Sequence, residues 1–152
     1  MSEDDPYSAP TPLRDRAAGD VALSASFTVA SGPDTGAAVR SFVRQTLREW
    51  EIDEAAANAA LDVAHELTSN AIQHGVPPIE LTLSRTPTEL LVVCADAQPV
   101  LAHRLPYRPG LSERGLGLRL VAQLSDEWGQ RSRDDGKEVW AAFRGGRRLH
   151  RH

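Results

Sequence analysis

Residues 61–75 place a helical apolar pattern next to polar side chains at the margin of that pattern. On a helix at about 100° per residue, the apolar positions gather on one broad face. That face comprises Ala60, Leu61, Val63, Ala64, Leu67, Ala71 and Ile72, and the opposite face comprises Asp62, His65, Ser69 and Gln73. Glu66 and Asn70 lie one turn apart on the seam between the two faces. Their oxygen atoms suit a hard cation such as Mg²⁺; the alternative is a helix with an ordinary polar rim.

Length and composition restrict the class of protein. A chain of 152 residues, 41% hydrophobic and 25% charged, predicts one soluble globular domain with a core of its own. Its net charge of −4 argues against nucleic acid or an anionic membrane as the main partner. The single Cys94 excludes a disulfide framework and a thiolate metal cluster. No stretch has the length of a membrane span and the start is acidic, so we expect a cytoplasmic protein.

The two ends of the chain differ from its middle. Residues 1–19 hold prolines among Ser, Asp and Arg without apolar periodicity, which predicts a disordered tail. Residues 144–152 are basic, and we expect a mobile C-terminal tail there. The segments with hydrophobic periodicity lie within residues 20–143, which we expect to form the folded domain.

Within that domain the pattern predicts strands and helices in turn. Alternation predicts a strand over 21–30, and helical spacing then continues from a cap at Ser31 or Asp34 to Trp50. The central helix follows, with Asp53 as its cap and Gly75 as its stop. The remaining expected elements are a strand at 79–85, a buried central strand at 90–95, a short helix from Gly115 to Leu124, and a hairpin of 127–132 and 137–143 turned by Asp134-Asp135-Gly136.

Three features fall in an order that suits a nucleotide site. Asp96 directly follows the buried strand, where a carboxylate can accept a hydrogen bond from the amino group of adenine. Residues 97–114 form a long connection of the kind that makes lids and binding loops. Gly115 and Gly117 open the next helix, where backbone N–H groups can approach phosphates. Together with the oxygen donors of the central helix, these features predict a site for a nucleotide and Mg²⁺.

Other sites fit less well. Gly136-Lys137 is followed by Glu138 rather than Ser or Thr, so it is not a Walker-type phosphate loop, and we expect Lys137 to be a solvated hairpin residue. The segment at Gly115 does not complete a dinucleotide-binding motif. The five histidines are dispersed, which argues against zinc. We expect His74, near a helix end, to interact with the helix dipole rather than to act in catalysis.

The segment from Glu66 to Gly75, Glu-Leu-Thr-Ser-Asn-Ala-Ile-Gln-His-Gly, resembles the N-box of the GHKL (Bergerat-fold) ATPases. Asp96 resembles the Asp of their G1 box, residues 114–118 are similar to the G2 box, and residues 136–141 are similar to a strand that ends many small members. The resemblance runs from Val21 to Phe143 and is greatest to the small anti-sigma-factor serine/threonine kinases. It implies an α+β fold, a two-layer α/β sandwich with helices on one face of a mixed, mainly antiparallel sheet.

The resemblance also implies roles for individual residues. ATP and Mg²⁺ would be the cofactors, with Asn70 coordinating the metal ion. Glu66 would be the general base that accepts the proton of a partner serine or threonine as it attacks the γ-phosphate. Arg114 would neutralise phosphate charge or be an exposed lid residue. The residues that would bind the nucleotide are Asn70, Asp96, Arg114, Gly115, Leu116 and Gly117.

The partners implied are a sigma factor and a small antagonist protein phosphorylated on Ser or Thr, and a homodimer is compatible with the family. One departure favours an alternative: Asp96 is followed by Ala97-Gln98-Pro99 where the G1 box continues with glycines. That alternative is a nucleotide-gated or nucleotide-free binding module without transferase activity. The catalytic domain of a two-component histidine kinase would need a helical phosphoacceptor segment, and the roughly 20 residues before the first strand show no helical period.

Overall fold

The structure is a computed structural model that describes residues 23–98 and 113–144. For residues 113–117 it describes the backbone only. The predicted N-terminal tail, most of the long connection at 97–114 and all but the first residue of the predicted C-terminal tail lie outside the described residues. That first residue, Arg144, ends the last strand.

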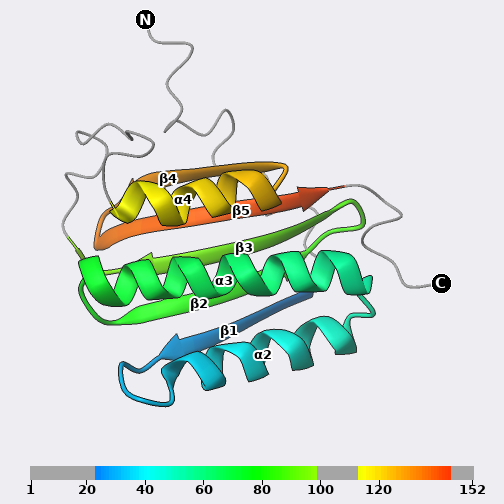
Figure 1. The fold of residues 1–152 in the computed structure, drawn as a ribbon, viewed down its shortest axis with the longest axis horizontal. Helices are drawn as coiled ribbons and strands as arrows, with labels where there is room; N and C mark the ends of the chain where they lie inside the picture. The colour runs from blue at the N-terminus through cyan, green and yellow to red at the C-terminus, as the bar shows by residue number, and fades with distance from the viewer. Residues whose placement is uncertain (1–22, 99–112, 145–152) are drawn as a thin grey trace, which may run out of the picture.

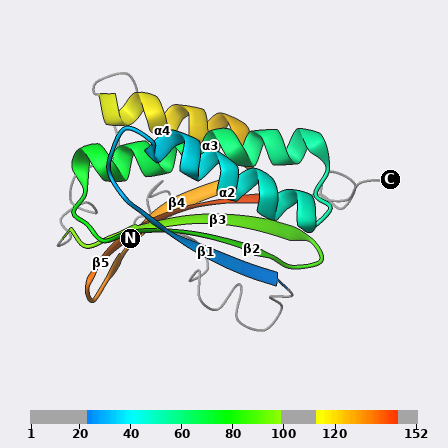
Figure 2. The same ribbon diagram turned by 90° about the horizontal axis from the view of Figure 1, so that it is seen from below.

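A five-stranded sheet and three helices make up the described part of the chain. The elements are β1 (Leu23–Val29), α2 (Thr35–Glu49), α3 (Glu54–His74), β2 (Ile79–Arg85), β3 (Glu89–Asp96), α4 (Glu113–Leu124), β4 (Glu127–Arg133) and β5 (Gly136–Arg144). The strand order is β1-β2-β3-β5-β4, and the four described pairings are all antiparallel. The helices lie side by side on one face of the sheet (Figures 1 and 2). The predicted two-layer α+β sandwich is confirmed.

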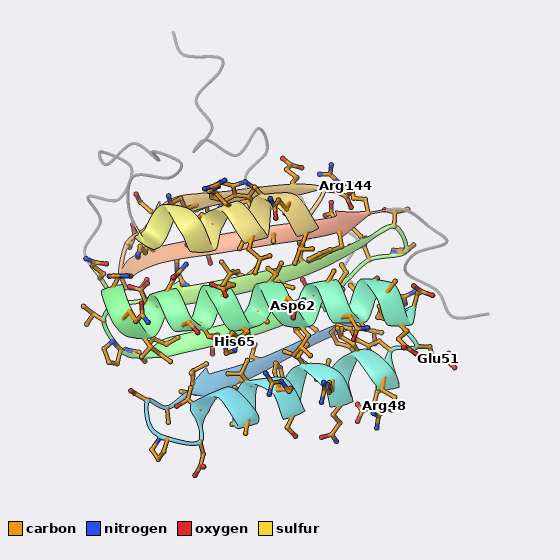
Figure 3. All side chains as sticks on the ribbon, viewed as in Figure 1. Arg48, Glu51, Asp62, His65 and Arg144 are labelled. Carbon is orange, nitrogen blue, oxygen red and sulfur yellow. The ribbon has the colours of Figure 1, made fainter. Side chains whose placement is uncertain are left out.

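Helix α3 lies over the middle of the sheet and follows the predicted boundaries. The Asp53 carboxylate accepts a hydrogen bond from the backbone N–H of Ala55 at 3.1 Å, which caps the first turn. The apolar face is buried as expected, while Asp62 and His65 are exposed on the other face (Figure 3). Thr68 is buried too, because its hydroxyl donates to the backbone oxygen of Ala64 at 2.9 Å and so satisfies its polar atom.

Helix α2 fastens the β1 edge of the sheet. It begins at Thr35, after Asp34, and the Asp34 side chain makes no capping bond there. Instead the Thr35 hydroxyl donates to the backbone oxygen of Gly32 at 2.9 Å. Phe27 of β1 stacks on Phe42 of α2 with ring centroids 5.1 Å apart, which buries aromatic surface on both sides of the contact.

Strand β3 is the middle strand, and its alternation decides which side chains face the helices. Leu90, Val92 and Cys94 belong to the main core under the helices. Leu91 packs instead with Trp140 and Ala142 in a second small cluster. Because side chains alternate along a strand, Asp96 lies on the same side of the sheet as Cys94. By the same rule, Lys137 of β5 shares the helix-covered side with Val139, Ala141 and Phe143.

None of the described helices combines the length and the apolar character that crossing a lipid bilayer requires.

Candidate nucleotide site

Asp96, the last residue of β3, is buried and held by backbone donors. Its Oδ1 atom accepts from the N–H of Gln98 at 2.8 Å and from the N–H of Val76 at 3.4 Å. The N–H of Ala97 in turn donates to the backbone oxygen of Val76 at 2.7 Å. Val76 lies just after the C-terminal end of α3, so these bonds join that end of the helix to the end of β3. The residue is only 7% exposed, and its carboxylate is therefore fixed in place.

Gly75 lies directly against the same carboxylate. A Cβ atom built on Gly75 would be 2.7 Å from Cγ and from Oδ2 of Asp96, and equally close to the backbone oxygen of Ala71. A side chain at this position would displace either the helix end or the carboxylate. The residue predicted as a helix stop thus has a second role, because its lack of a side chain leaves room for the Asp96 carboxylate.

Lys137 is opposite Asp96 across the β3–β5 ladder. Its Nζ atom is 3.6 Å from Oδ2 of Asp96, and the side chains are 16% and 4% exposed respectively. The prediction that Lys137 is a solvated hairpin residue is therefore wrong. The strands approach closely here, since a Cβ on Gly136, at φ 154°, would be 2.0 Å from the backbone oxygen of Asp96. Sequence reasoning missed this pair because it depends on which strand lies beside β3.

Cys94, two residues before Asp96, is a buried core thiol. Burial, and secondarily the charge of Asp96, raises the pKa of this thiol from 9.0 to about 12, while Lys137 acts in the opposite direction. The thiolate is the reactive form of cysteine, so Cys94 is unsuited to nucleophilic chemistry at neutral pH.

Glu66 and Asn70 lie half-buried on α3, one turn apart. Within the described part of the chain, neither side chain is engaged in a hydrogen bond or an ion pair. Asn70 precedes Gly75 by five residues, which corresponds to about 7.5 Å along the helix axis. The two oxygen-bearing side chains thus share a helix with the residue that contacts the Asp96 carboxylate.

His74 is the last residue of α3. Its Nε2 atom is buried and has no hydrogen-bond partner among the residues that the structure describes. The position agrees with the expected place at a helix C-terminus, where a positive charge interacts favourably with the helix dipole.

The prediction that Gly115 opens the helix is wrong by two residues, because α4 begins at Glu113 and Gly115 and Gly117 lie within its first turns. The side chains of Arg114 and Leu116 lie outside the described residues. In Figure 1 the beginning of α4, the end of α3, the end of β3 and the beginning of β5 all lie at the left edge of the fold. This shared edge, between the sheet and helices α3 and α4, is the candidate site.

The donor groups at this edge and farther back along α3 are of the kinds that a nucleotide and a metal ion require. Oδ2 of Asp96 is an acceptor in a largely desolvated place, where an amino group of a base would be read with high selectivity. The side-chain oxygens of Glu66 and Asn70 are the atoms that Mg²⁺ prefers. The beginning of a helix with glycines offers N–H groups to phosphate oxygens.

Comparisons with known proteins agree with this geometry. The sequence matches the model of the histidine kinase-like ATPase domain over residues 29–143. No curated protein matches it. The fold resembles a solved structure described as the crystal structure of the RsbU and RsbW domains of Rv1364c from Mycobacterium tuberculosis, with a TM-score of 0.61. The match is 16% identical and covers 80% of this chain but 32% of that one, so the chain spans about a third of the solved protein and the likeness shows a shared fold.

Proposed function

The chain belongs to the histidine kinase-like ATPase domain family, the GHKL ATPases, and we propose on this premise that it binds ATP with Mg²⁺ at the shared edge of α3, α4, β3 and β5. The observation that carries the proposal is the fixed, buried carboxylate of Asp96 with Gly75 directly against it. A carboxylate is costly to bury and is expected where a ligand or a neighbour compensates it.

In this proposal Asp96 reads the adenine ring. Its Oδ1 atom already accepts two backbone N–H groups, so Oδ2 is the atom left to accept the exocyclic amino group. A base without that donor would leave Oδ2 with only its long contact to Lys137, and a site built to make such a hydrogen bond typically discriminates by a factor of about 10⁴. The same backbone bonds keep the carboxylate oriented before the nucleotide arrives, which lowers the entropy cost of binding.

Asn70 and Glu66 would act at the phosphate end. The Asn70 carboxamide oxygen is a suitable ligand for Mg²⁺, and the Glu66 carboxylate can take up the proton of an attacking hydroxyl. The metal ion, when bound, neutralises charge on the phosphates. The N–H groups at the beginning of α4, near Gly115 and Gly117, would bind phosphate oxygens.

We further propose that the protein is a regulatory kinase of the anti-sigma type. The support is the similarity of the segment from Glu66 to Gly75 to the N-box of the small anti-sigma kinases, together with the fold shared with a chain that includes an RsbW domain. The substrate would be a serine or threonine of a small antagonist protein, and a second surface would hold a sigma factor. Ala97-Gln98-Pro99, which stands in place of glycines, favours the alternative of a binding module without transferase activity.

Titration calorimetry of ATP and ADP, with and without Mg²⁺, tests the binding proposal. We expect the wild type to bind both nucleotides, Asp96→Asn to weaken binding about a hundredfold or more, and Asn70→Ala to abolish the Mg²⁺ dependence. His65→Ala, on the exposed face of the same helix, is the matched control and should bind as the wild type does. The absence of heat and of a thermal shift at high nucleotide concentration would refute ATP binding.

Transfer of labelled γ-phosphate to candidate antagonist proteins tests the kinase proposal. Glu66→Gln should abolish transfer while ATP binding is retained, because the amide keeps the shape of the side chain but cannot accept a proton. Replacement of the acceptor serine or threonine by alanine is the control on the substrate side. Partner binding that is unaffected by Glu66→Gln, together with no transfer by the wild type, would support the binding module instead.

A further inference from the structure

On the proposed function, the ion pair of Asp96 and Lys137 lies where the base of the nucleotide binds. Both residues are at the ends of their strands, on the side of the sheet that the helices cover. The Nζ–Oδ2 distance of 3.6 Å exceeds the 2.7–2.9 Å that is usual for a charged hydrogen bond. The ammonium group is therefore close to the carboxylate without donating a proton to it at hydrogen-bond distance.

Lys137 is more buried than is usual for a lysine in a hairpin. The Lys137 side chain is 16% exposed, and its only ion pair within the described residues is the long one with Asp96. An ammonium group in a partly desolvated place is stabilised by each short hydrogen bond that it makes. A ligand that offers an acceptor beside the carboxylate would supply such a bond. The adenine ring has such an edge, because its N1 atom, an acceptor, is adjacent to the exocyclic amino group, a donor.

We propose that Lys137 and Asp96 together recognise the adenine edge, with Lys137 donating to N1 while Asp96 accepts from the amino group. This inference rests on the proposed ATP binding and assigns a second specificity-determining residue to that site. Guanine presents an oxygen in place of the amino group, so in the adenine pose it would direct an acceptor at the carboxylate. Both members of the pair therefore select against it.

The test compares ATP with 1-deaza-ATP, in which a C–H group replaces N1. Titration calorimetry with Mg²⁺ should show that the wild type binds 1-deaza-ATP about tenfold more weakly than ATP, the loss expected for one hydrogen bond to a charged group. Lys137→Met should bind ATP about tenfold more weakly than the wild type, and it should bind ATP and 1-deaza-ATP equally. An equal penalty for 1-deaza-ATP in both proteins would overturn the proposal.

Lys137→Gln provides a second variant if Lys137→Met is poorly folded. Its amide can still donate, so it should keep part of the preference for ATP over 1-deaza-ATP. GTP and ITP serve as further ligands, and binding of GTP by the wild type as tightly as ATP would also overturn the proposal. Near-UV circular dichroism of each variant verifies that the fold is retained.

The same titrations separate this inference from the proposed function. ATP binding that depends on Asp96 but is indifferent to Lys137 would leave the proposed function standing and would refute the role of Lys137. No ATP binding by the wild type, or binding unchanged in Asp96→Asn, would refute both.

Discussion

The two ends of the β3–β5 ladder each carry a pair of opposite charges, and the pairs differ in kind. At one end Glu89 is opposite Arg144, and at the other Asp96 is opposite Lys137. Arg144 donates from Nε to Glu89 at 2.7 Å and also bonds to Glu127 of β4. Figure 3 shows Arg144 at the far end of β5 from the candidate site. The corresponding distance between Lys137 and Asp96 is 3.6 Å.

The difference in geometry indicates which of the two ion pairs stabilises the sheet. A guanidinium presents several donors in a planar fork, so Arg144 can join Glu89 and Glu127, and the hydrogen bond to Glu89 foremost raises the pKa of Arg144. The backbone N–H of Arg144 also donates to Asp126 at 2.6 Å. This cluster connects the end of β5 with the beginnings of β3 and β4. Within the described residues, the charged groups of Lys137 and Asp96 are linked only by a long contact, which leaves Nζ and Oδ2 able to bind a ligand.

The largest effect should follow from Gly75→Ala, which alters the surroundings of the Asp96 carboxylate. The new Cβ would be 2.7 Å from that carboxylate and from a backbone oxygen, so we expect about a hundredfold weaker ATP binding and about 1–3 kcal/mol lower free energy of unfolding. Calorimetry and urea denaturation measure the two effects. Gly32→Ala is the matched control, because nothing lies within 4 Å of a Cβ there. Equal behaviour of the two variants would contradict the described contact.

Glu89→Ala should lower stability without weakening ATP binding, whereas Gly75→Ala should affect both. Glu89 is 8% exposed, and its removal takes away the acceptor of the Arg144 Nε–H, so we expect a loss of about 1–2 kcal/mol in the free energy of unfolding. The loss is small because the Arg144 side chain is 42% exposed and water screens its charge. ATP affinity should be unchanged. A fall in affinity comparable to that of Gly75→Ala would show that the two ends are not independent.

Cys94 should make stability depend on alkaline pH. Its pKa is about 12 in the folded protein and 9.0 in the unfolded reference, so the unfolded chain loses the thiol proton first. Stability from this group is complete below the unfolded pKa and is lost as pH rises toward the folded one. The advantage of wild type over Cys94→Ala in free energy of unfolding should therefore narrow by about 1 kcal/mol between roughly pH 8 and 10. A constant difference would contradict the shift.

Lys137→Met should give the smallest change in stability. The lost ion pair is long, two backbone N–H groups still hold the Asp96 carboxylate, and the Met side chain can fill the volume of the lysine stem, so we expect less than about 1 kcal/mol in urea denaturation. A loss as large as that of Glu89→Ala would mean that the Lys137 pair also maintains the sheet. The comparison between the two ends would then fail.

Local patterns predicted most of the fold. The strand at 79–85 and the α3 boundaries at Asp53 and Gly75 are confirmed, because alternation, helical spacing and capping act within a few residues. The Asp-Gly turn likewise predicted the hairpin of β4 and β5. The resemblance to the GHKL ATPases is confirmed at the level of family and fold, while the roles of Glu66 and Asn70 stay predictions.

Contacts between distant segments could not be predicted in this way. The burial of Lys137 depends on β5 lying beside β3, a choice that no local pattern encodes. The approach of Gly75 to Asp96 needs the end of α3 to meet the end of β3, and the Gly-Val-Pro-Pro sequence indicates only that the helix stops. The packing of Trp140 with Leu91, on the sheet face away from the helices, likewise depends on β5 lying beside β3.

Helix α3 also sets the distance between Asn70 and the end of the helix beside Asp96. Asn70 lies four residues before His74, where α3 ends, and Gly75 follows directly, so the distance from Asn70 to the helix end is fixed by a rise of about 1.5 Å per residue and its direction by about 100° per residue. On the proposed function, the number of residues between Asn70 and the helix end therefore determines the distance between the metal ion and the base. Inserting one alanine between Asn70 and the helix end would rotate Asn70 to another side of the helix while the base pocket stayed intact. Such a protein should still distinguish bases, but Asn70 should no longer hold the metal ion at the phosphates.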